Sequence, residues 1–255
     1  MQIPVPFEHP YLAGEGFVCF AHRGGALENA ENTKQAFSAA IELGYRFIET
    51  DVQATADGVV LVFHDDTLER MTDGSGLVSS LPYSEVRQTR IRGTEPIMTL
   101  EEALLEFPDT RFNIDIKTDH ALEPTLALAR KMGCLDRVCL ASFSDARLRE
   151  LRARFGPQVC SGASPRDVSM LKFGSWGVPN QGTPANCAQV PVRQFGVTLV
   201  TPRFVKHSND HGIAVHVWTI DEESEMRRLI RLGVNGIMSD RPSLLKKVAQ
   251  EEGVW

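Results

Sequence analysis

The sequence has no long apolar run and no run of basic residues. No apolar stretch among its 255 residues approaches the roughly 20 that a membrane-spanning helix needs, so we expect no transmembrane segment. The formal net charge is −6, and without clusters of Lys or Arg it argues against a nucleic-acid or anionic-membrane partner. Residues 1–14 also lack the basic start and the apolar core of a signal peptide.

Cysteine is scarce, and its count is odd. Three of the five cysteines, Cys19, Cys139 and Cys160, lie in apolar runs, where we expect small buried thiols. A reducing cytoplasm is the compartment that fits such a chain. A domain of this length buries roughly three quarters of its unfolded surface, so it needs neither a metal nor a disulfide to fold. We predict a single domain over residues 1–255.

Eight strand-like runs alternate with amphipathic segments, several of which end at a glycine, a common helix stop. The runs cover residues 17–22, 46–51, 112–117, 138–143, 158–163, 187–192, 214–219 and 236–240. The helical segments include 32–43, 100–107, 121–132, 145–155, 202–211 and 222–232. Eight such units predict an α/β fold, a (β/α)8 TIM barrel. A doubly wound open sheet is the alternative, but no GxGxxG follows a strand. Residues 197–201 compete with 187–192 for the sixth strand.

Two segments interrupt this alternation. Residues 66–98 form a polar excursion with one helical piece near 83–88, which we interpret as a small insertion after the hairpin that follows the second strand. Residues 173–188 are rich in Gly and Pro and contain Trp176. A loop this long in a compact domain is usually functional or disordered, and we interpret it as a lid or rim over the barrel mouth.

The hairpin signal Asp57-Gly58 lies between an acidic motif and a histidine. A two-residue type I′ turn there would place Asp51 directly opposite His64, with Cβ atoms about 5 Å apart. The other face of the hairpin would then be apolar. It would carry Val52, Ala54, Leu61 and Phe63.

Polar side chains gather where the predicted strands end, which is where barrels of this kind carry their active sites. His22 ends the first run. Glu49 and Asp51 end the second, and Asp115 and Lys117 end the third. The i, i+2 spacing puts both members of each pair on one strand face, so the sequence predicts that they point into the barrel mouth together.

Three carboxylates without cysteine form a hard-oxygen site that favours Mg²⁺ or Ca²⁺ over zinc. We expect one divalent cation held by Glu49, Asp51 and Asp115, because their mutual repulsion is costly if no cation joins them. The alternative is an internal salt-bridge network in which they pair with Arg23 or Lys117. Beside a metal, Arg23 and Lys117 would instead clamp a phosphate.

His22 and His64 each end an apolar run next to these carboxylates. Acid–base catalysis of hydrolysis needs one group to take up a proton or attack and another to protonate the leaving group, and two histidines suit this chemistry. We assign His64 as the acid, supported by Asp65, and His22 as the base or nucleophile, with its pKa lowered by Arg23 and the metal. His216 is expected to be a satisfied interior histidine rather than a catalyst.

Two further segments have structural interpretations. In Glu31-Asn32-Thr33, either Asn32 or Thr33 is expected to cap the next helix, although Glu31 lies close enough in sequence to His22 to reach the site. The stretch 239–242 ends the last strand and is expected to be structural.

These residues resemble the glycerophosphodiester phosphodiesterase family. The matching stretches are AHRGG at 21–25, ENT at 31–33, FIETDVQATADGVVLVFHDDTLER at 47–70, FNIDIK at 112–117, VHVWTID at 215–221 and GVNGIMSDRP at 233–242. The resemblance implies a metal-dependent TIM-barrel phosphodiesterase that uses Glu49, Asp51 and Asp115 as metal ligands and His22 and His64 as its catalytic pair. It also implies that Trp218 is a wall for the glycerol or headgroup, with core packing as the alternative. Asp115 stands where many members have Glu.

The implied reaction is hydrolysis of a glycerophosphodiester to glycerol 3-phosphate and an alcohol. A second hypothesis is lysophospholipase D-type hydrolysis at the same site, with Trp176, Val178, Pro179 and residues 189–191 forming an acyl groove. A third is an inactive barrel kept as a binding protein. The expected partner is a small-molecule phosphodiester, and the sequence leaves the headgroup, the oligomeric state and the choice of Mg²⁺ or Ca²⁺ open.

Overall fold

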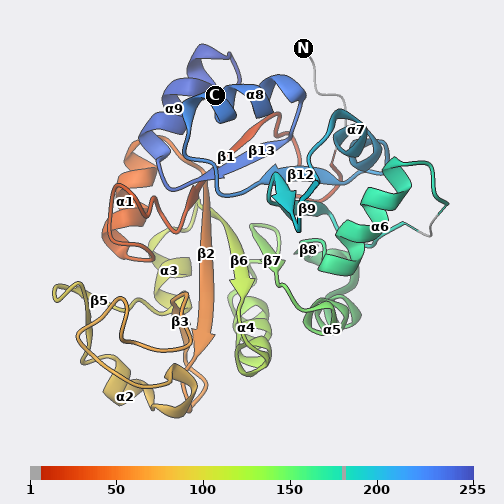
Figure 1. The fold of residues 1–255 in the computed structure, drawn as a ribbon. Helices are drawn as coiled ribbons and strands as arrows, with labels where there is room; N and C mark the ends of the chain where they lie inside the picture. The colour runs from red at the N-terminus through yellow and green to blue at the C-terminus, as the bar shows by residue number, and fades with distance from the viewer. Residues whose placement is uncertain (1–6, 180–181) are drawn as a thin grey trace.

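The structure, a computed structural model, describes residues 7–179 and 182–255. Residues 1–6 fall within the N-terminal segment 1–14 and residues 180–181 within the predicted lid, and both ranges lie outside the described residues. Figure 1 shows a ring of strands with helices around its outside. None of the helices in the described ranges is long and apolar enough to cross a membrane.

Eight parallel strands make up the ring, in the order β8-β7-β6-β2-β1-β13-β12-β9. They are β1 (Val18–His22), β2 (Phe47–Ala54), β6 (Arg111–Ile116), β7 (Val138–Ala141), β8 (Cys160–Ser161), β9 (Cys187–Val190), β12 (Ala214–Val217) and β13 (Gly236–Ser239). A parallel bridge between Gly162 and Cys187 joins the two ends of this order. The predicted TIM barrel is therefore confirmed, and the open doubly wound sheet is wrong.

Helices follow the strands around the outside of the barrel (Figure 1). They are α1 (Lys34–Glu42), α3 (Leu100–Glu106), α4 (Asp119–Met132), α5 (Asp145–Phe155), α6 (Pro165–Ser175), α7 (Pro202–Asp210), α8 (Glu223–Leu232) and α9 (Pro242–Glu251). The sixth barrel strand is β9, as the first of the two competing predictions had it. Residues 197–198 instead form β11, which pairs with β10 (Arg193–Gln194) in a small hairpin.

Side-chain alternation along β6 shows how the sequence divides the core from the site. Phe112, Ile114 and Ile116 are buried in the main apolar cluster between the strands and the helices. Asn113 and Asp115, on the opposite face of the same strand, line a cavity inside the barrel. The alternating pattern thus fixes which residues can take part in chemistry.

The predicted insertion extends from the end of β2, at the lower left of Figure 1. After the hairpin strand β3 (Val60–Val62), its elements are the 3-10 turn η1 (Val78–Ser80), α2 (Tyr83–Val86), β4 (Arg90–Ile91) and β5 (Glu95–Pro96). The helical piece expected near 83–88 is present as α2. The insertion packs with hairpin residues Leu61 and Phe63 in a separate apolar cluster, whose other members are Leu68, Met71, Val78, Val86, Ile91 and Ile97.

The predicted register of the β2–β3 hairpin is wrong by one residue. Val52 pairs with Val62, and the backbone N–H of Phe63 donates to Asp51 O at 2.9 Å, so Asp51 lies opposite Phe63 rather than His64. The loop has three residues instead of two, with Gly58 at φ +83° as in three-residue loops that end in a left-handed residue. A one-residue shift reverses the faces.

The reversed faces put Leu61 and Phe63 into the apolar cluster of the insertion. Val52, Ala54, Val60 and Val62 instead bury into the main core. The apolar face that the sequence predicted for this hairpin is therefore split between two clusters.

The interpretation of residues 173–188 as a lid over the barrel mouth is also wrong for the described residues. Helix α6 ends at Ser175, and helices of a β/α barrel run antiparallel to its strands, so α6 ends at the face opposite the mouth. At the far end of the segment, the Asn186 carbonyl accepts a hydrogen bond from Ala214 N at 3.1 Å, at the start of β12. None of residues 173–179 or 182–188 lines the cavity.

Candidate active site

A cavity of about 230 Å³ lies at the carboxyl ends of the barrel strands. Its lining includes every residue that the sequence nominates. They are His22, Arg23, Glu49, Asp51, His64, Asp115, Lys117 and Trp218. His64 reaches the cavity from the end of the hairpin although it does not lie opposite Asp51.

The chain turns sharply after β1, and the turn explains the sequence His-Arg-Gly. Arg23 has a left-handed φ of +53°, and its N–H donates to Glu49 O at 2.9 Å. Gly24 has φ +80°, and a Cβ there would lie 2.8 Å from both Ala36 Cβ and Phe37 Cδ1. Only glycine fits this position without displacing α1, and the turn directs the Arg23 side chain into the cavity.

Asp51 is the centre of a buried ion-pair network. Lys117 Nζ lies 3.2 Å from Asp51 Oδ1 and 3.0 Å from Asp115 Oδ2. Arg23 Nε lies 3.2 Å from Asp51 Oδ2. Asn32 Nδ2 donates to the same oxygen at 3.3 Å. The internal salt-bridge network, which the sequence analysis left as the alternative to a metal site, is therefore present.

The carboxyl groups of this network titrate differently. Burial works to raise the pKa of Asp51, but Lys117 and Arg23 outweigh it and hold that pKa below its usual value. Burial and the neighbouring Asp51 raise the pKa of Glu49 to about 7. Burial also raises the pKa of Asp115, against the effect of Lys117. The two available cations thus neutralise Asp51 and leave Glu49 and Asp115 poorly compensated.

One carboxylate oxygen bears directly on whether a cation fits here. Asp115 Oδ1 is buried, and it has no hydrogen-bond partner among the described residues. Within that part of the chain, the oxygens of Glu49, Asp51 and Asp115 do not all lie within 4.8 Å of one another, and Lys117 bridges two of them. The oxygen-only donor set fits Mg²⁺ or Ca²⁺, and a cation would compete with Lys117 for Asp51 and Asp115.

His22 is held by two carboxylates. Its Nδ1 lies 2.6 Å from Asp240 Oδ1, and its Nε2 lies 3.6 Å from Glu49 Oε2. Burial works to lower the pKa of His22, but Glu49 and Asp240 outweigh burial and Arg23 and raise it. The prediction that the pKa of His22 is lowered is therefore wrong for the charged side chains that surround it.

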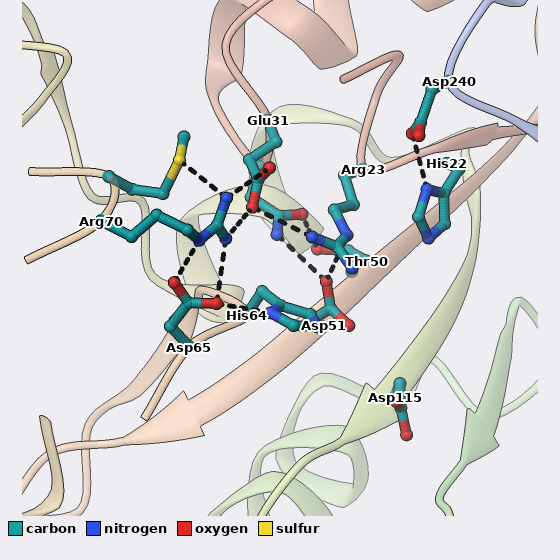
Figure 2. A network of polar contacts seen from close by, with 12 residues as sticks. His22, Arg23, Glu31, Thr50, Asp51, His64, Asp65, Arg70, Asp115 and Asp240 are labelled. Carbon is teal, nitrogen blue, oxygen red and sulfur yellow. Dashed lines mark hydrogen bonds and ion pairs between the residues drawn. The ribbon is translucent and has the colours of Figure 1, made fainter. Parts of the chain in front are cut away.

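His64 belongs to a second chain of contacts, drawn in Figure 2. Its Nδ1 lies 2.6 Å from Asp65 Oδ1, so the expected support from Asp65 is present. Arg70 bonds Asp65 through Nε and also reaches Glu31 Oε1 at 2.6 Å, and its hydrogen bonds lower the pKa of Asp65 to about 2. Glu31 accepts from Arg23 Nη1 at 3.1 Å as well.

The lining from β7, β8, β9 and β12 carries most of the apolar residues of the cavity, together with Ser142, Gln189, Gln194 and Thr219. Trp218 lines the cavity and also packs on the interior cluster, so the substrate-wall and core-packing interpretations both describe its position. The ring of Phe143 meets Trp218 edge-on, with centroids 5.8 Å apart. Further apolar lining comes from Ala141, Ala163, Pro165, Val168, Val190 and Pro191.

Sequence reasoning missed two supporting residues. Asp240 lies in the stretch 239–242 that was expected to be only structural, yet it orients His22. Thr33, not Asn32, caps α1, and Asn32 orients Asp51 at a left-handed φ of +58°. Asparagine tolerates that conformation, but the sequence alone does not show that the chain adopts it.

Comparison with known proteins identifies the family of this chain. The model of the glycerophosphoryl diester phosphodiesterase family matches residues 22–244. The protein named "Probable glycerophosphodiester phosphodiesterase 2" of Mycobacterium tuberculosis is 36% identical over 254 residues, which cover 96% of this chain and 95% of that protein. Lysophospholipase D GDPD1 of Homo sapiens is 27% identical over 89% of this chain and 84% of its own length.

Solved structures show the same fold. Glycerophosphodiester phosphodiesterase from Agrobacterium tumefaciens str. C58 superimposes with a TM-score of 0.76 at 24% identity, covering 92% of this chain and 99% of its own. An Oleispira antarctica phosphodiesterase in complex with the product sn-glycerol-3-phosphate gives a TM-score of 0.76 at 23% identity, over 92% and 97%.

The fold and the relatives place the chain among TIM-barrel phosphoric diester hydrolases. The chain belongs to the glycerophosphoryl diester phosphodiesterase family. The predicted family and the prediction that the chain is an enzyme are thereby confirmed, and the hypothesis of an inactive binding barrel is set aside.

The raised pKa of Glu49 predicts how stability depends on pH when divalent ions are removed. Between its usual value of 4.5 and about 7, the folded protein holds a proton that the unfolded chain has lost, so the free energy of unfolding falls as pH rises through this window. At about 1.4 kcal/mol per pH unit, the loss is on the order of 3 kcal/mol. We expect Glu49→Gln to remove this loss, and denaturant unfolding in chelator at pH 4.5 and pH 8 measures it.

Glu31→Gln is the matched control, because it removes ion pairs with Arg23 and Arg70 and should lower stability at pH 8. Parallel pH curves for the wild type and Glu49→Gln would contradict the assignment to Glu49.

Proposed function

We propose that the protein hydrolyses glycerophosphodiesters to glycerol 3-phosphate and an alcohol, in a reaction that depends on one divalent cation. The observation that carries this proposal is the convergence of two histidines, three carboxylates and two cations in one cavity. The glycerol 3-phosphate bound to the Oleispira antarctica relative supports this product, and the names of the relatives support the substrate class.

Glu49, Asp51 and Asp115 are the proposed ligands, and Mg²⁺ and Ca²⁺ are both compatible with their oxygens. When bound, the cation would polarise the phosphoryl oxygens and offset the charge that develops on them. The unpartnered Asp115 Oδ1 and the poorly compensated Glu49 support this assignment. Release of Lys117 from Asp51 and Asp115 would free its ammonium for the phosphate.

Arg23 and Lys117 are the proposed phosphate clamp. Arg23 offers a planar fork and Lys117 a mobile point charge. Both already face the cavity through their contacts with Asp51, so neither side chain has to be recruited from solvent. Trp218 and Phe143 are the proposed wall for the glycerol or the leaving alcohol.

The proton transfers are assigned from the ring nitrogens. Asp240 occupies Nδ1 of His22, and Asp65 occupies Nδ1 of His64, so Nε2 is the reactive atom of each histidine. We assign Nε2 of His22 as the base or nucleophile, beside Glu49, and Nε2 of His64 as the acid that protonates the leaving alkoxide. The Arg70 bridge positions the acid by fixing Asp65.

We also propose that residues 1–255 act as one phosphodiesterase domain, with the insertion joined to the barrel through the Arg70–Glu31 contact. A cytoplasmic location fits the five free, buried cysteines, since thiols persist in reducing compartments. The proposed partner is a small phosphodiester.

A second candidate function is lysophospholipase D-type hydrolysis. The apolar wall of the cavity favours it, because Phe143 is 61% exposed beside Trp218 and could contact an acyl chain. Residues 189–191 line this wall as the groove hypothesis requires. Trp176 and Val178 do not line it, which shortens the groove and makes this function the weaker candidate.

Metal removal should abolish turnover of glycerophosphocholine. We expect no activity in chelator and recovery with Mg²⁺ or Ca²⁺, measured by release of glycerol 3-phosphate. Asp115→Asn should lose more than about 100-fold in kcat while its unfolding midpoint in chelator stays within a few degrees of wild type.

The matched control is Asp109→Asn, an exposed aspartate outside the cavity, which should keep full activity. Full turnover by a metal-stripped sample in chelator would contradict the proposal that activity depends on a divalent cation.

The histidine roles can be separated with leaving groups. A nitrophenol phosphodiester needs little protonation to depart, so His64→Ala should lose about one to two powers of ten less rate on it than on glycerophosphocholine. His22→Ala should lose equally on both substrates. Exposed His211→Ala is the control for histidine removal, and identical losses for both cavity mutants on both substrates would show that the roles are wrong.

A substrate pair decides between the two candidate functions. We expect kcat/KM for glycerophosphocholine to exceed that for monomeric palmitoyl lysophosphatidylcholine by at least about tenfold, the scale that one apolar contact can contribute. If the lysophospholipid is the better substrate, and Phe143→Ser lowers only that rate, the second function replaces the first. Leu105→Ser, at an exposed position outside the cavity, is the matched control for loss of an exposed apolar side chain.

A further inference from the structure

Three cysteines converge inside the barrel, where the proposed hydrolysis has no use for them. Cys139, Cys160 and Cys187 lie on the neighbouring strands β7, β8 and β9, and all three are fully buried. Their sulfurs lie within 4.8 Å of one another, with Cys139 Sγ 3.6 Å from Cys187 Sγ. Sulfur ligands of tetrahedral zinc are about 3.8 Å apart, so the cluster needs little adjustment to hold an ion.

Two buried polar side chains without partners adjoin the same cluster. Neither ring nitrogen of His216 nor the hydroxyl of Tyr11 has a hydrogen-bond partner among the described residues, and both side chains are 0% exposed. An unsatisfied buried polar group costs about 1–3 kcal/mol. Tyr11 belongs to the same buried cluster as the three cysteines. The prediction that His216 is a satisfied histidine is wrong, although the residue is interior.

Cys187 is the point where the thiols and the imidazole meet. Its Sγ lies 3.6 Å from Cys139 Sγ, and the three sulfurs all lie within 4.8 Å of one another. Ala214, two residues before His216 on the same face of β12, pairs with Cys187. The strand that carries His216 therefore lies directly beside the strand that carries Cys187.

The position of the imidazole depends on Gly236 of the neighbouring strand β13. A Cβ at residue 236 would lie 3.0 Å from Cδ2 of His216 and 2.7 Å from Val18 O. Because residue 236 has no side chain, the His216 ring fits into the barrel interior. There it packs on Phe20, with ring centroids 4.9 Å apart.

We propose that Cys139, Cys160, Cys187 and His216 form a closed zinc site inside the barrel. Three thiolates and an imidazole in tetrahedral array are a usual donor set for structural Zn²⁺. His216 is not within 4.8 Å of all three sulfurs, so the ring turns toward them on binding. The Tyr11 hydroxyl then donates to a thiolate and offsets the surplus negative charge, as outer-shell donors of metal sites do.

The zinc site is separate from the catalytic cavity. Asn113 and Gln189 line that cavity and hydrogen-bond across the barrel interior at 2.6 Å, whereas none of the three cysteines lines it. Because all ligands are buried, the ion enters as the barrel folds and leaves slowly. A chelator that removes the catalytic cation should therefore leave the zinc in place.

The test uses the whole protein, expressed with added zinc under reducing conditions and passed through chelator. We expect about one zinc per chain by elemental analysis, and zinc-edge X-ray absorption should show three sulfurs at about 2.3 Å and one nitrogen at about 2.0 Å. This measurement needs no variant, so it decides the proposal even if changes at the cysteines prevent folding.

Variants then assign the ligands. Cys139→Ser and Cys187→Ser should each retain less than about a tenth of the zinc, since thiolates supply most of the binding. His216→Ala should lose the nitrogen from the absorption spectrum. Cys19→Ser and Cys134→Ser are matched controls, because both thiols are buried outside the cluster, and they should keep the full zinc content.

Glu49→Gln separates the two metal sites, because it should keep the zinc while it loses the proposed catalytic ligand. Zinc below about a tenth of one equivalent in wild type, an absorption spectrum dominated by oxygen neighbours, or a disulfide within the cluster in reduced protein would overturn the proposal.

Discussion

The site depends on holding three carboxyl groups in a barrel interior that disfavours their charge. Burial acts against the ionised forms of Glu49, Asp51 and Asp115, and the chain supplies two cations, Arg23 and Lys117, to offset it. Both are drawn to Asp51, which is the best compensated of the three. Because Arg23 and Lys117 compensate Asp51 more than the other two carboxyl groups, negative charge in the cavity is left without a partner. A cation that prefers oxygen ligands can supply that partner.

The same constraint explains structure outside the cavity. Arg23 reaches Asp51 from a left-handed turn. Its Nη1 reaches Glu31, and Arg70 of the insertion shares that carboxylate. Through Asp65, Arg70 also orients His64. The insertion is thus connected to Asp51 through one continuous set of charged contacts, visible in Figure 2, so the position of the second histidine is coupled to the turn that follows β1.

How far the sequence predicts this site follows from the range of each interaction. That Glu49 and Asp51 lie on one face is a local property of a strand, and the repetition of β–α units predicts the barrel. Both features can therefore be predicted from the sequence. The position of His64 depends on the length of one turn, where a single extra residue shifts the whole register. The contact of Asp240 with His22 joins residues 218 apart, and no local pattern encodes it. The position of the described residues of 173–188 away from the mouth follows from helix direction, which loop composition does not reveal.

The barrel interior also keeps two kinds of donor in different layers. Cys139 precedes Ala141 on β7 and Cys187 precedes Gln189 on β9, with the later residue of each pair in the cavity. Alternation places both members of a pair on one face, so sulfur donors lie one layer away from the oxygen donors. Thiolates bind zinc in preference to carboxylates, whereas Mg²⁺ and Ca²⁺ bind oxygen alone. Zinc would therefore bind the sulfur layer, and Mg²⁺ or Ca²⁺ would bind the oxygen layer. The two metals would not compete for ligands, and the oxygen layer would stay available to the cation that assists phosphoryl chemistry.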